Sequence, residues 1–123
     1  MLFRSADVRV AILSAMETVT AKVPSTIEAA ALCKMAERGQ ITGAVLDGPL
    51  ALDNAISREA AAAKHINSPV AGDADILVAP DLEAGNLLAK ELSFLANADA
   101  AGDRKSTRLS SSHLKLSRMP SSA

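Results

Sequence analysis

Aromatic residues are almost absent from this sequence, which has two phenylalanines, no tyrosine and no tryptophan in 123 residues. A hydrophobic core must therefore be built from alanine, leucine, isoleucine and valine, and the aromatic platforms on which single-stranded nucleic acids stack are lacking. Cys33 is the one cysteine, so the sequence offers no internal disulfide and no cysteine cluster for a metal. This cysteine usage favours a reducing, cytoplasmic setting.

Long apolar runs are also missing. No stretch approaches the roughly 18–20 apolar residues that a membrane-spanning helix needs, and residues 1–7 lack the basic-then-apolar order of a signal peptide. Apolar residues make up 49% of the sequence and charged residues 22%, which is ordinary for a globular protein. We therefore expect one domain at most, in the cytoplasm, with no membrane partner.

The chain changes composition near Gly102. Residues 1–102 carry 8 basic and 13 acidic residues, whereas residues 103–123 carry five basic residues, one acidic residue and seven serines. A basic tail of this kind is typical of nucleic-acid binding. Residues 103–113, however, resemble the translation of a common sequencing adapter, and residues 117–123 resemble its continuation after an index-sized gap. We expect the segment to be an artefactual, disordered basic tail that binds no nucleic acid.

Strand and helix patterns alternate along residues 1–102. Short runs of β-branched and apolar residues predict three strands, at residues 8–13, 41–46 and 74–79. Helical spacing predicts three helices, at residues 24–39, 57–65 and 82–96. The alternation of strand and helix predicts an α/β fold with a mostly parallel sheet.

The first predicted helix carries the clearest end signals. Ser25 and Glu28 have the spacing of a capping box, and Gly39 suits the left-handed residue that ends many helices. One apolar face is expected from Ile27, Ala31, Leu32 and Met35.

Two loops follow predicted strands at the place where open α/β sheets bind ligands. Asp47 and Gly48 follow the second strand, and Asp81, Gly85 and Asn86 follow the third, at the start of the last helix. A helix N-terminus suits phosphate or pyrophosphate. A carboxylate there repels an anion and instead suits helix capping, which is the interpretation that spacing favours for Asp81.

A third loop, from Ser68 to Gly72, precedes the third predicted strand. In a parallel sheet it lies at the edge opposite the other two loops. Either that strand runs antiparallel or the loop is structural, and the sequence leaves both open.

Cys33 lies on the first predicted helix between Leu32 and Met35, and no histidine is placed to activate it. Packing is therefore favoured over a nucleophilic role. No set of histidine, cysteine and carboxylate residues has metal-ligand spacing, so no metal is expected. Three lysines are expected on solvated helix faces, namely Lys34, Lys64 and Lys90.

Four segments occur in the same order in phosphate acetyl/butyryltransferases, namely residues 24–32, 47–55, 68–77 and 80–86. The chain resembles that family over nearly all of residues 8–102, closest to the branch fused or related to enoyl-CoA hydratase. The resemblance implies reversible transfer of an acetyl or butyryl group between coenzyme A and inorganic phosphate. It also implies a partial isocitrate/isopropylmalate-dehydrogenase-like three-layer fold, incomplete at both ends, and a homodimer when intact. Coenzyme A would be a substrate, and no cofactor would be permanently bound.

The resemblance also bears on the site. The family's Ser-Arg pair and downstream Asp fall beyond Gly102, so no catalytic residue is assigned and the chain as written is expected to be inactive. Ser117 and Arg118 match that pair only superficially, and Phe94 stands where some relatives have a phosphate-binding arginine. The residues expected to line the cleft are Asp47, Gly48, Ser68, Gly72, Asp81, Gly85 and Asn86. Turn formation or capping explains each of them at least as well.

Two other functions remain open at this point. One is an NAD(P)-dependent dehydrogenase of the same broad fold, against which the absence of a glycine-rich cofactor loop argues. The other is a non-enzymatic nucleic-acid-binding module that uses residues 103–123.

Overall fold

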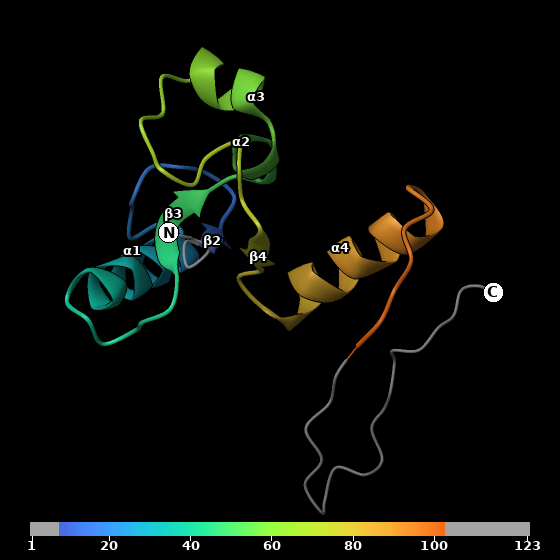
Figure 1. Ribbon diagram of the computed structural model, residues 1–123, viewed down its shortest axis with the longest axis horizontal. Helices are drawn as coiled ribbons and strands as arrows, with labels where there is room; N and C mark the ends of the chain where they lie inside the picture. Colours follow the sequence, from blue (N-terminus) through green and yellow to red (C-terminus); the bar gives the residue numbers. More distant parts are fainter. Residues whose placement is uncertain (1–7, 103–123) are drawn as a thin grey trace, which may run out of the picture. The chain divides into compact units, whose positions relative to one another are not determined.

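The fold is an α/β arrangement around one three-stranded sheet. The computed structural model describes residues 8–102, and the expected tail at 103–123 lies outside them. The strands are β2 (Arg9–Leu13), β3 (Val45–Leu50) and β4 (Ile76–Val78). The helices are α1 (Pro24–Glu37), α2 (Leu52–Ile56), α3 (Arg58–Ala63) and α4 (Leu82–Phe94). The strand order is β3-β2-β4 with both pairings parallel, so the predicted parallel α/β class is confirmed (Figure 1).

The middle strand, β2, forms the centre of the core. Its last four residues are buried, as expected for a parallel strand covered on both faces. Val10 and Ile12 pack with Ala29 of α1 on one face. Because side chains alternate along a strand, Ala11 and Leu13 point to the other face, on the side of α2.

Helix α1 begins without the predicted capping box. Val23 is its N-cap residue, and no side chain caps the helix there. Ser25 instead lies inside the first turn, where its hydroxyl is 2.8 Å from that of Ser14. The prediction was wrong because Pro24 occupies the first helical position, which suits its fixed backbone angle and moves the N-cap two residues earlier, from Ser25 to Val23. The predicted end is confirmed, since Gly39 has a φ of 84° directly after the C-cap.

The face of α1 that packs on the sheet agrees with the prediction only in part, since Leu32 packs against the core as predicted but Ile27 is exposed. Thr26 and Ala29 are fully buried and Cys33 is half-buried, whereas Ile27 is 45% exposed. These small residues let the helix approach β2 and β3 closely. Packing this small-residue face on the sheet is therefore more favourable than burying the larger side chain of Ile27 on the neighbouring face.

Strand β3 lies four residues later than predicted. Residues 41–44 form the approach to the strand, and Val45 begins it by donating its backbone N–H to Val8 C=O at 2.8 Å. The segment expected to stop the strand, from Asp47 to Pro49, is part of it. β3 is an edge strand among the described residues, where a proline without an N–H donor is tolerated. The Gly48–Pro49 peptide is cis.

Two short helices replace the single helix predicted at 57–65. Ser57 ends α2 and begins α3, and its hydroxyl accepts the backbone N–H of Ala60 at 3.1 Å. The start of α3 after Ser57 is thus confirmed. Helix α2 was missed because it has five residues and its N-cap, Ala51, provides no capping side chain.

The last strand and helix are shorter than predicted and expose apolar side chains. β4 is joined to β2 by Asp75, whose backbone N–H bonds to Arg9 C=O at 2.8 Å and whose carboxylate accepts the Arg9 N–H at 2.9 Å. Ile76 is 48% exposed and Val78 36% exposed, so this strand presents apolar side chains at the surface of the described residues.

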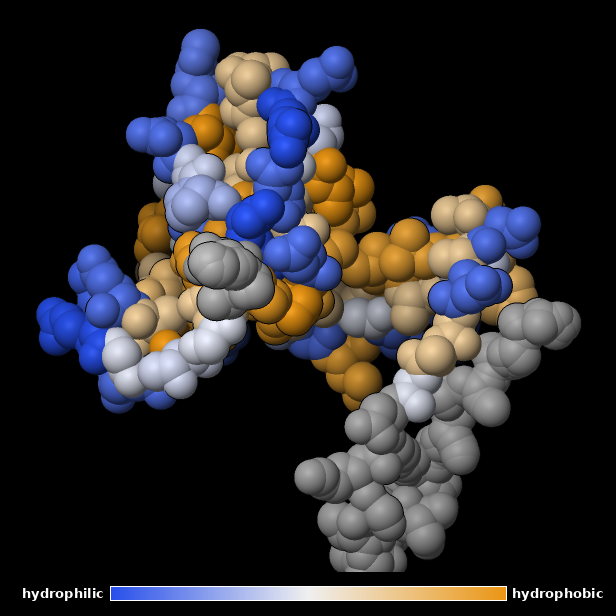
Figure 2. Space-filling view, in the orientation of Figure 1, coloured by the Kyte–Doolittle hydropathy of each residue, from blue (hydrophilic) through white to orange (hydrophobic). Residues whose placement is uncertain are grey.

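The chain divides after Gly85 into two compact units, and most of α4 belongs to the second. No residue of α4 is buried, and Figure 2 shows apolar surface along this helix.

Within residues 8–102 no helix combines the length and apolar character needed to cross a membrane.

Candidate functional site

Polar side chains gather beyond the carboxyl ends of β2 and β3. Glu17 comes from the loop after β2, Asp53 and Asn54 come from α2, and Lys64 caps the end of α3. The Glu17 carboxylate accepts hydrogen bonds from the Asn54 amide and, at 3.1 Å, from the Lys64 ammonium. Lys64 also lies 3.8 Å from Asp53. The Glu17 carboxylate therefore joins the loop after β2 to the neighbouring helices α2 and α3, which lie much later in the sequence.

The cluster has a net negative charge, since the carboxylates of Glu17 and Asp53 outnumber the one ammonium group of Lys64. The hydrogen bond from Lys64 to Glu17 raises the pKa of the Lys64 ammonium, with a smaller contribution from Asp53. Lys64 was predicted to lie on a solvated helix face, and its side chain is indeed 46% exposed, but it is paired rather than free. A cation neutralised by two carboxylates is a poor site for an additional phosphate group.

Asn54 is the buried member of the cluster. Its side chain is 0% exposed, and its amide N–H₂ is used by Glu17. Its carbonyl oxygen, Oδ1, has no hydrogen-bond partner among the described residues. A buried acceptor left without a partner costs about 1–3 kcal/mol, so Asn54 has a local energetic disadvantage.

The loop after β2 is held at two further points. Ser14 donates its backbone N–H to Leu50 C=O at 2.9 Å, at the ends of β2 and β3. Thr26 bonds to Thr20 in both directions at 2.9 Å and donates to Val23 C=O at 2.7 Å. The loop residues between Ser14 and Thr20 include Glu17, whose hydrogen bonds join the loop to α2 and α3.

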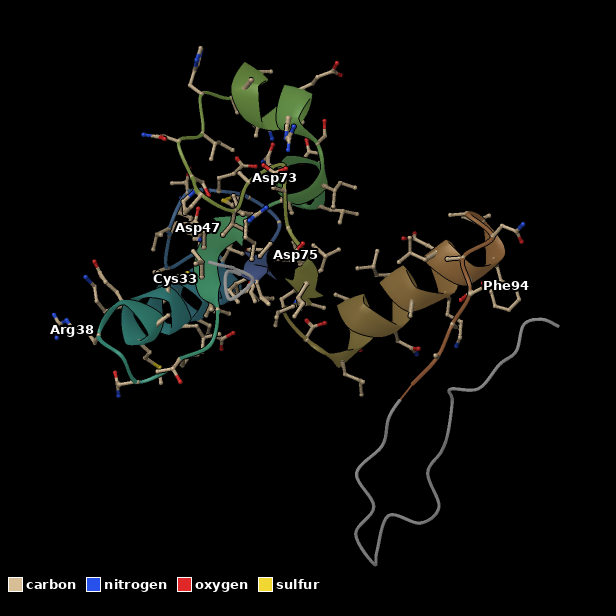
Figure 3. The ribbon with its side chains drawn as sticks, in the orientation of Figure 1. Cys33, Arg38, Asp47, Asp73, Asp75 and Phe94 are labelled. Atoms are coloured by element: carbon tan, nitrogen blue, oxygen red, sulfur yellow. The ribbon has the colours of Figure 1, made fainter. Side chains whose placement is uncertain are left out.

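Asp47 and Gly48 lie within β3, next to α1. The Cys33 thiol is 3.7 Å from Gly48 C=O, and Figure 3 labels Cys33 and Asp47 on these adjoining elements. Burial, and secondly the negative charge of Asp47, raise the pKa of the Cys33 thiol to about 11. The thiol is therefore un-ionised at neutral pH, which agrees with the predicted packing role.

Gly48 itself is required by packing. A Cβ at this position would lie 2.6 Å from the Ile12 backbone oxygen, because β3 passes very close to β2. A cavity of about 570 Å³ lies between α1 and β3, and its lining includes Gly48 and Cys33.

Ser68 and Gly72 shape the turn before β4. The Ser68 hydroxyl accepts the backbone N–H groups of Val70 and Ala71, each at 3.0 Å. Because β4 is parallel to β2, the antiparallel alternative for this strand is wrong, and these contacts are those of a structural turn. Gly72 nevertheless lies beside the polar cluster, since its N–H donates to Asn54 C=O at 2.7 Å.

An ion pair fixes the chain after Gly72. Arg58 contacts the Asp73 carboxylate through Nε at 2.8 Å and through a terminal nitrogen at 2.5 Å. The hydrogen bond from Arg58 lowers the pKa of Asp73. A Cβ on Gly72 would lie 2.8 Å from the Arg58 Cα, so this turn is closely packed against α3.

Asp81 caps α4. Its carboxylate accepts the backbone N–H of Ala84 at 2.7 Å, which confirms the capping interpretation. Gly85 lies in the first turn of α4, where a Cβ would approach Ala79 Cβ to 3.3 Å. Asn86 is exposed and belongs to the second compact unit.

Replacement of Asp81 by alanine is expected to remove this cap and to lower the free energy of unfolding by about 1 kcal/mol. Asp81→Asn keeps an oxygen acceptor and should retain most of the stability. Urea unfolding of both variants, followed by circular dichroism, measures the difference. Equal losses in the two variants would show that charge, rather than capping, is what Asp81 contributes.

The seven predicted residues do not form one constellation. In the strand register Asp47 and Leu77 both pair with Ala11, so β3 and β4 lie on opposite sides of β2, about 10 Å apart. Asp47 therefore lies on one side of β2, and Asp81 follows the strand on the other side. Within residues 8–102 no group of three histidine, cysteine or acidic side chains is placed to hold a metal ion.

Comparison with known proteins decides the family. A family model described as "Phosphate acetyl/butaryl transferase" matches residues 2–103. The chain belongs to this family.

Relatives within the phosphate acetyl/butyryltransferase family are close in sequence. A phosphate acetyltransferase of Rhizobium meliloti is 81% identical over 94 residues, which are 76% of this chain and 30% of that protein. A phosphate butyryltransferase of Clostridium acetobutylicum is 48% identical over 94 residues, which are 76% of this chain and 31% of that protein. The chain thus spans about a third of the length of these curated relatives.

Solved structures of related enzymes share the backbone arrangement. The EutD phosphotransacetylase from Staphylococcus aureus superposes with a TM-score of 0.68 at 32% identity, over 78% of this chain and 30% of that one. A branched-chain phosphotransacylase from Enterococcus faecalis V583 superposes with a TM-score of 0.66 at 38% identity, over 74% of this chain and 32% of that one.

Sequence reasoning missed Glu17 and Lys64 as members of a cluster. Glu17 lies in a loop without a motif, and Lys64 is 47 positions away from it, so only tertiary structure brings them together. Asn54 left one signal in the sequence, since it follows Asp53 directly after a strand and precedes a run of alanines.

Proposed function

We propose that this chain forms part of an enzyme that transfers an acetyl or butyryl group between coenzyme A and inorganic phosphate. The observation that carries the proposal is the 81% identity to a phosphate acetyltransferase over 94 residues. In the direction that forms acyl-CoA, the thiolate of coenzyme A attacks the carbonyl carbon of the acyl phosphate. The carbon–sulfur bond forms, the bond from carbon to the phosphate oxygen breaks, and phosphate leaves with the negative charge. The proton of the thiol passes to a base.

In this proposal the carboxyl edge of the sheet forms part of the wall of the substrate cleft. The residues predicted from the sequence remain the proposed lining of the cleft, namely Asp47, Gly48, Ser68, Gly72, Asp81, Gly85 and Asn86. Of these, Asp47 and Gly48 lie within β3, and Ser68 and Gly72 precede β4. The contacts described above favour positioning and turn roles for most of them, and the groups that carry out proton transfer and stabilise the oxyanion would lie elsewhere in the intact enzyme. Coenzyme A and phosphate are substrates, and no resident cofactor is proposed.

The wider assignment is also a proposal, and it extends the family resemblance. We propose an isocitrate/isopropylmalate-dehydrogenase-like three-layer fold of which residues 1–102 form a part. The intact enzyme is proposed to be a cytoplasmic homodimer. Residues 103–123 are proposed to be artefactual and to have no role in it.

A chimeric enzyme tests the function directly. The 94 aligned residues of the Rhizobium meliloti phosphate acetyltransferase are replaced by those of this chain, and formation of acetyl-CoA from acetyl phosphate and coenzyme A is followed. Turnover within about tenfold of the parent enzyme is expected, because 81% of the exchanged residues are identical in the two proteins. A folded chimera of the parent's oligomeric state without turnover would contradict the proposal. The 123-residue chain alone is expected to give no turnover.

A further inference from the structure

Asn54 has a buried side chain whose position is fixed independently of the loop that it contacts. Its backbone C=O accepts the Gly72 N–H at 2.7 Å, and its N–H is bonded to the Asp53 carboxylate at 2.9 Å. The next residue, Ala55, accepts the Ala74 N–H at 3.2 Å. These hydrogen bonds join helix α2 to the segment that leads into β4. The backbone that carries the Asn54 amide is therefore fixed in position.

The amide acts on one residue of the loop after β2. Glu17 lies in the loop between Ser14 and Thr20. Within the described residues 8–102, it is the only residue of that loop whose side chain forms a hydrogen bond to a helix. The bond from Asn54 is buried on the donor side and has a charged acceptor, which makes it a strong type of hydrogen bond. The bond from Lys64 is a half-exposed ion pair, a type that contributes little.

The unpaired Asn54 Oδ1 argues against a role in stability alone. An apolar side chain of similar size at this position would leave no buried acceptor without a partner, but it would also remove the amide donor from Glu17. An asparagine is thus a poor choice for filling this part of the core. Its amide donor, directed at the loop, is what distinguishes it from leucine.

We propose that Asn54 is a positioning residue, which through Glu17 holds the loop of residues 14–23 at the carboxyl edge of the sheet. The inference rests on the proposed function, since that edge is where acyl-CoA and phosphate would bind. Asn54 does not touch the reacting atoms. It fixes the loop, and the loop lies at the edge of the sheet where the substrates are proposed to bind.

Backbone ¹⁵N relaxation of the 123-residue chain tests the positioning. In the unchanged chain, residues 15–18 should have order parameters near 0.85, and Asn54→Leu should lower them below about 0.6. Glu17→Ala removes the same bond from the loop side and should give the same result, which keeps the test valid if Asn54→Leu impairs folding. Lys64→Ala is the matched control, because it removes the exposed bond to the same carboxylate, and it should leave the order parameters unchanged. Unchanged order in both Asn54→Leu and Glu17→Ala would overturn the proposal.

The active chimera tests whether the loop matters for substrate. Asn54→Leu is expected to raise the KM for acetyl phosphate or coenzyme A about tenfold, since a displaced loop at the substrate edge weakens productive binding. Val10→Ala, on the core face toward α1, should lower the unfolding midpoint without changing KM. An unchanged KM in Asn54→Leu would overturn the link to the site. Inactivity of the unmutated chimera would instead contradict the proposed function and leave the relaxation result to decide the positioning.

Discussion

Replacement of Gly48 by alanine is expected to lower the free energy of unfolding by about 3 kcal/mol or more. The added Cβ would lie 2.6 Å from the Ile12 backbone oxygen and 2.8 Å from the Ile12 Cβ. Backbone atoms in the middle of a sheet cannot move aside as a flexible side chain can, so β3 and β2 must separate. Since small domains have only about 5–15 kcal/mol of stability, urea unfolding should show a large loss.

Two other glycines provide matched controls. Gly43 has a φ of 95° and nothing lies within 4 Å of an added Cβ, so Gly43→Ala should cost only the left-handed backbone strain, about 1–2 kcal/mol. Gly72 combines a φ of 84° with a contact of 2.8 Å to the Arg58 Cα, so Gly72→Ala should exceed Gly43→Ala. If Gly48→Ala costs no more than Gly43→Ala, the close approach of β3 to β2 is not required for stability.

Alkylation of Cys33 at pH 8 is expected to be about 100-fold slower in the folded chain than in the urea-unfolded chain. The thiolate is the reactive form, and the pKa of Cys33 rises from the ordinary 9.0 to about 11, which lowers the thiolate fraction about 100-fold. The raised pKa means that the folded state favours the neutral thiol. This preference is fully present below pH 9 and is lost as the pH rises through about 11. Cys33 is the one cysteine, so the total iodoacetamide reaction reports on it alone.

A second variant separates the two causes of the raised pKa. Burial is the larger cause and the charge of Asp47 the smaller. Asp47→Asn should therefore speed alkylation only modestly, and the folded chain should remain much slower than the unfolded chain. Equal rates in folded and unfolded chains would mean that Cys33 is not packed against Gly48.

The order and type of the main elements could be predicted from the sequence, whereas their bounds could not. The β2 run is apolar and β-branched on both faces, so periodicity alone identified it. β3 was displaced because Gly48 and Pro49 are turn residues by local rules, and only the neighbouring β2 makes them suitable for an edge strand. Ser25 and Glu28 have the spacing of a capping box, but Pro24 takes the first helical position, so Ser25 lies inside the helix rather than at its cap.

The candidate site was less predictable than the fold for the same reason. Asp81 was correctly interpreted as a cap because a capping residue acts on a backbone N–H three positions away. The cluster of Glu17, Asn54 and Lys64 depends on contacts across 37 and 47 positions, which no local pattern records. The segments of the family resemblance include Asn54, within residues 47–55, but neither Glu17 nor Lys64.

The position of β2 at the centre of the sheet has a consequence for how the chain folds. Its pairing with β3 joins Arg9 to Val45, but its pairing with β4 requires contacts across 66 positions, from Arg9 to Asp75. A ribosome that adds about 5–20 residues per second needs several seconds to supply that second neighbour. During this interval one edge of an apolar strand has no partner, and contacts of such long range form slowly. The nascent chain is therefore most exposed to aggregation before residues 76–78 emerge, and a chaperone that binds extended apolar segments would find its target at Val10–Leu13.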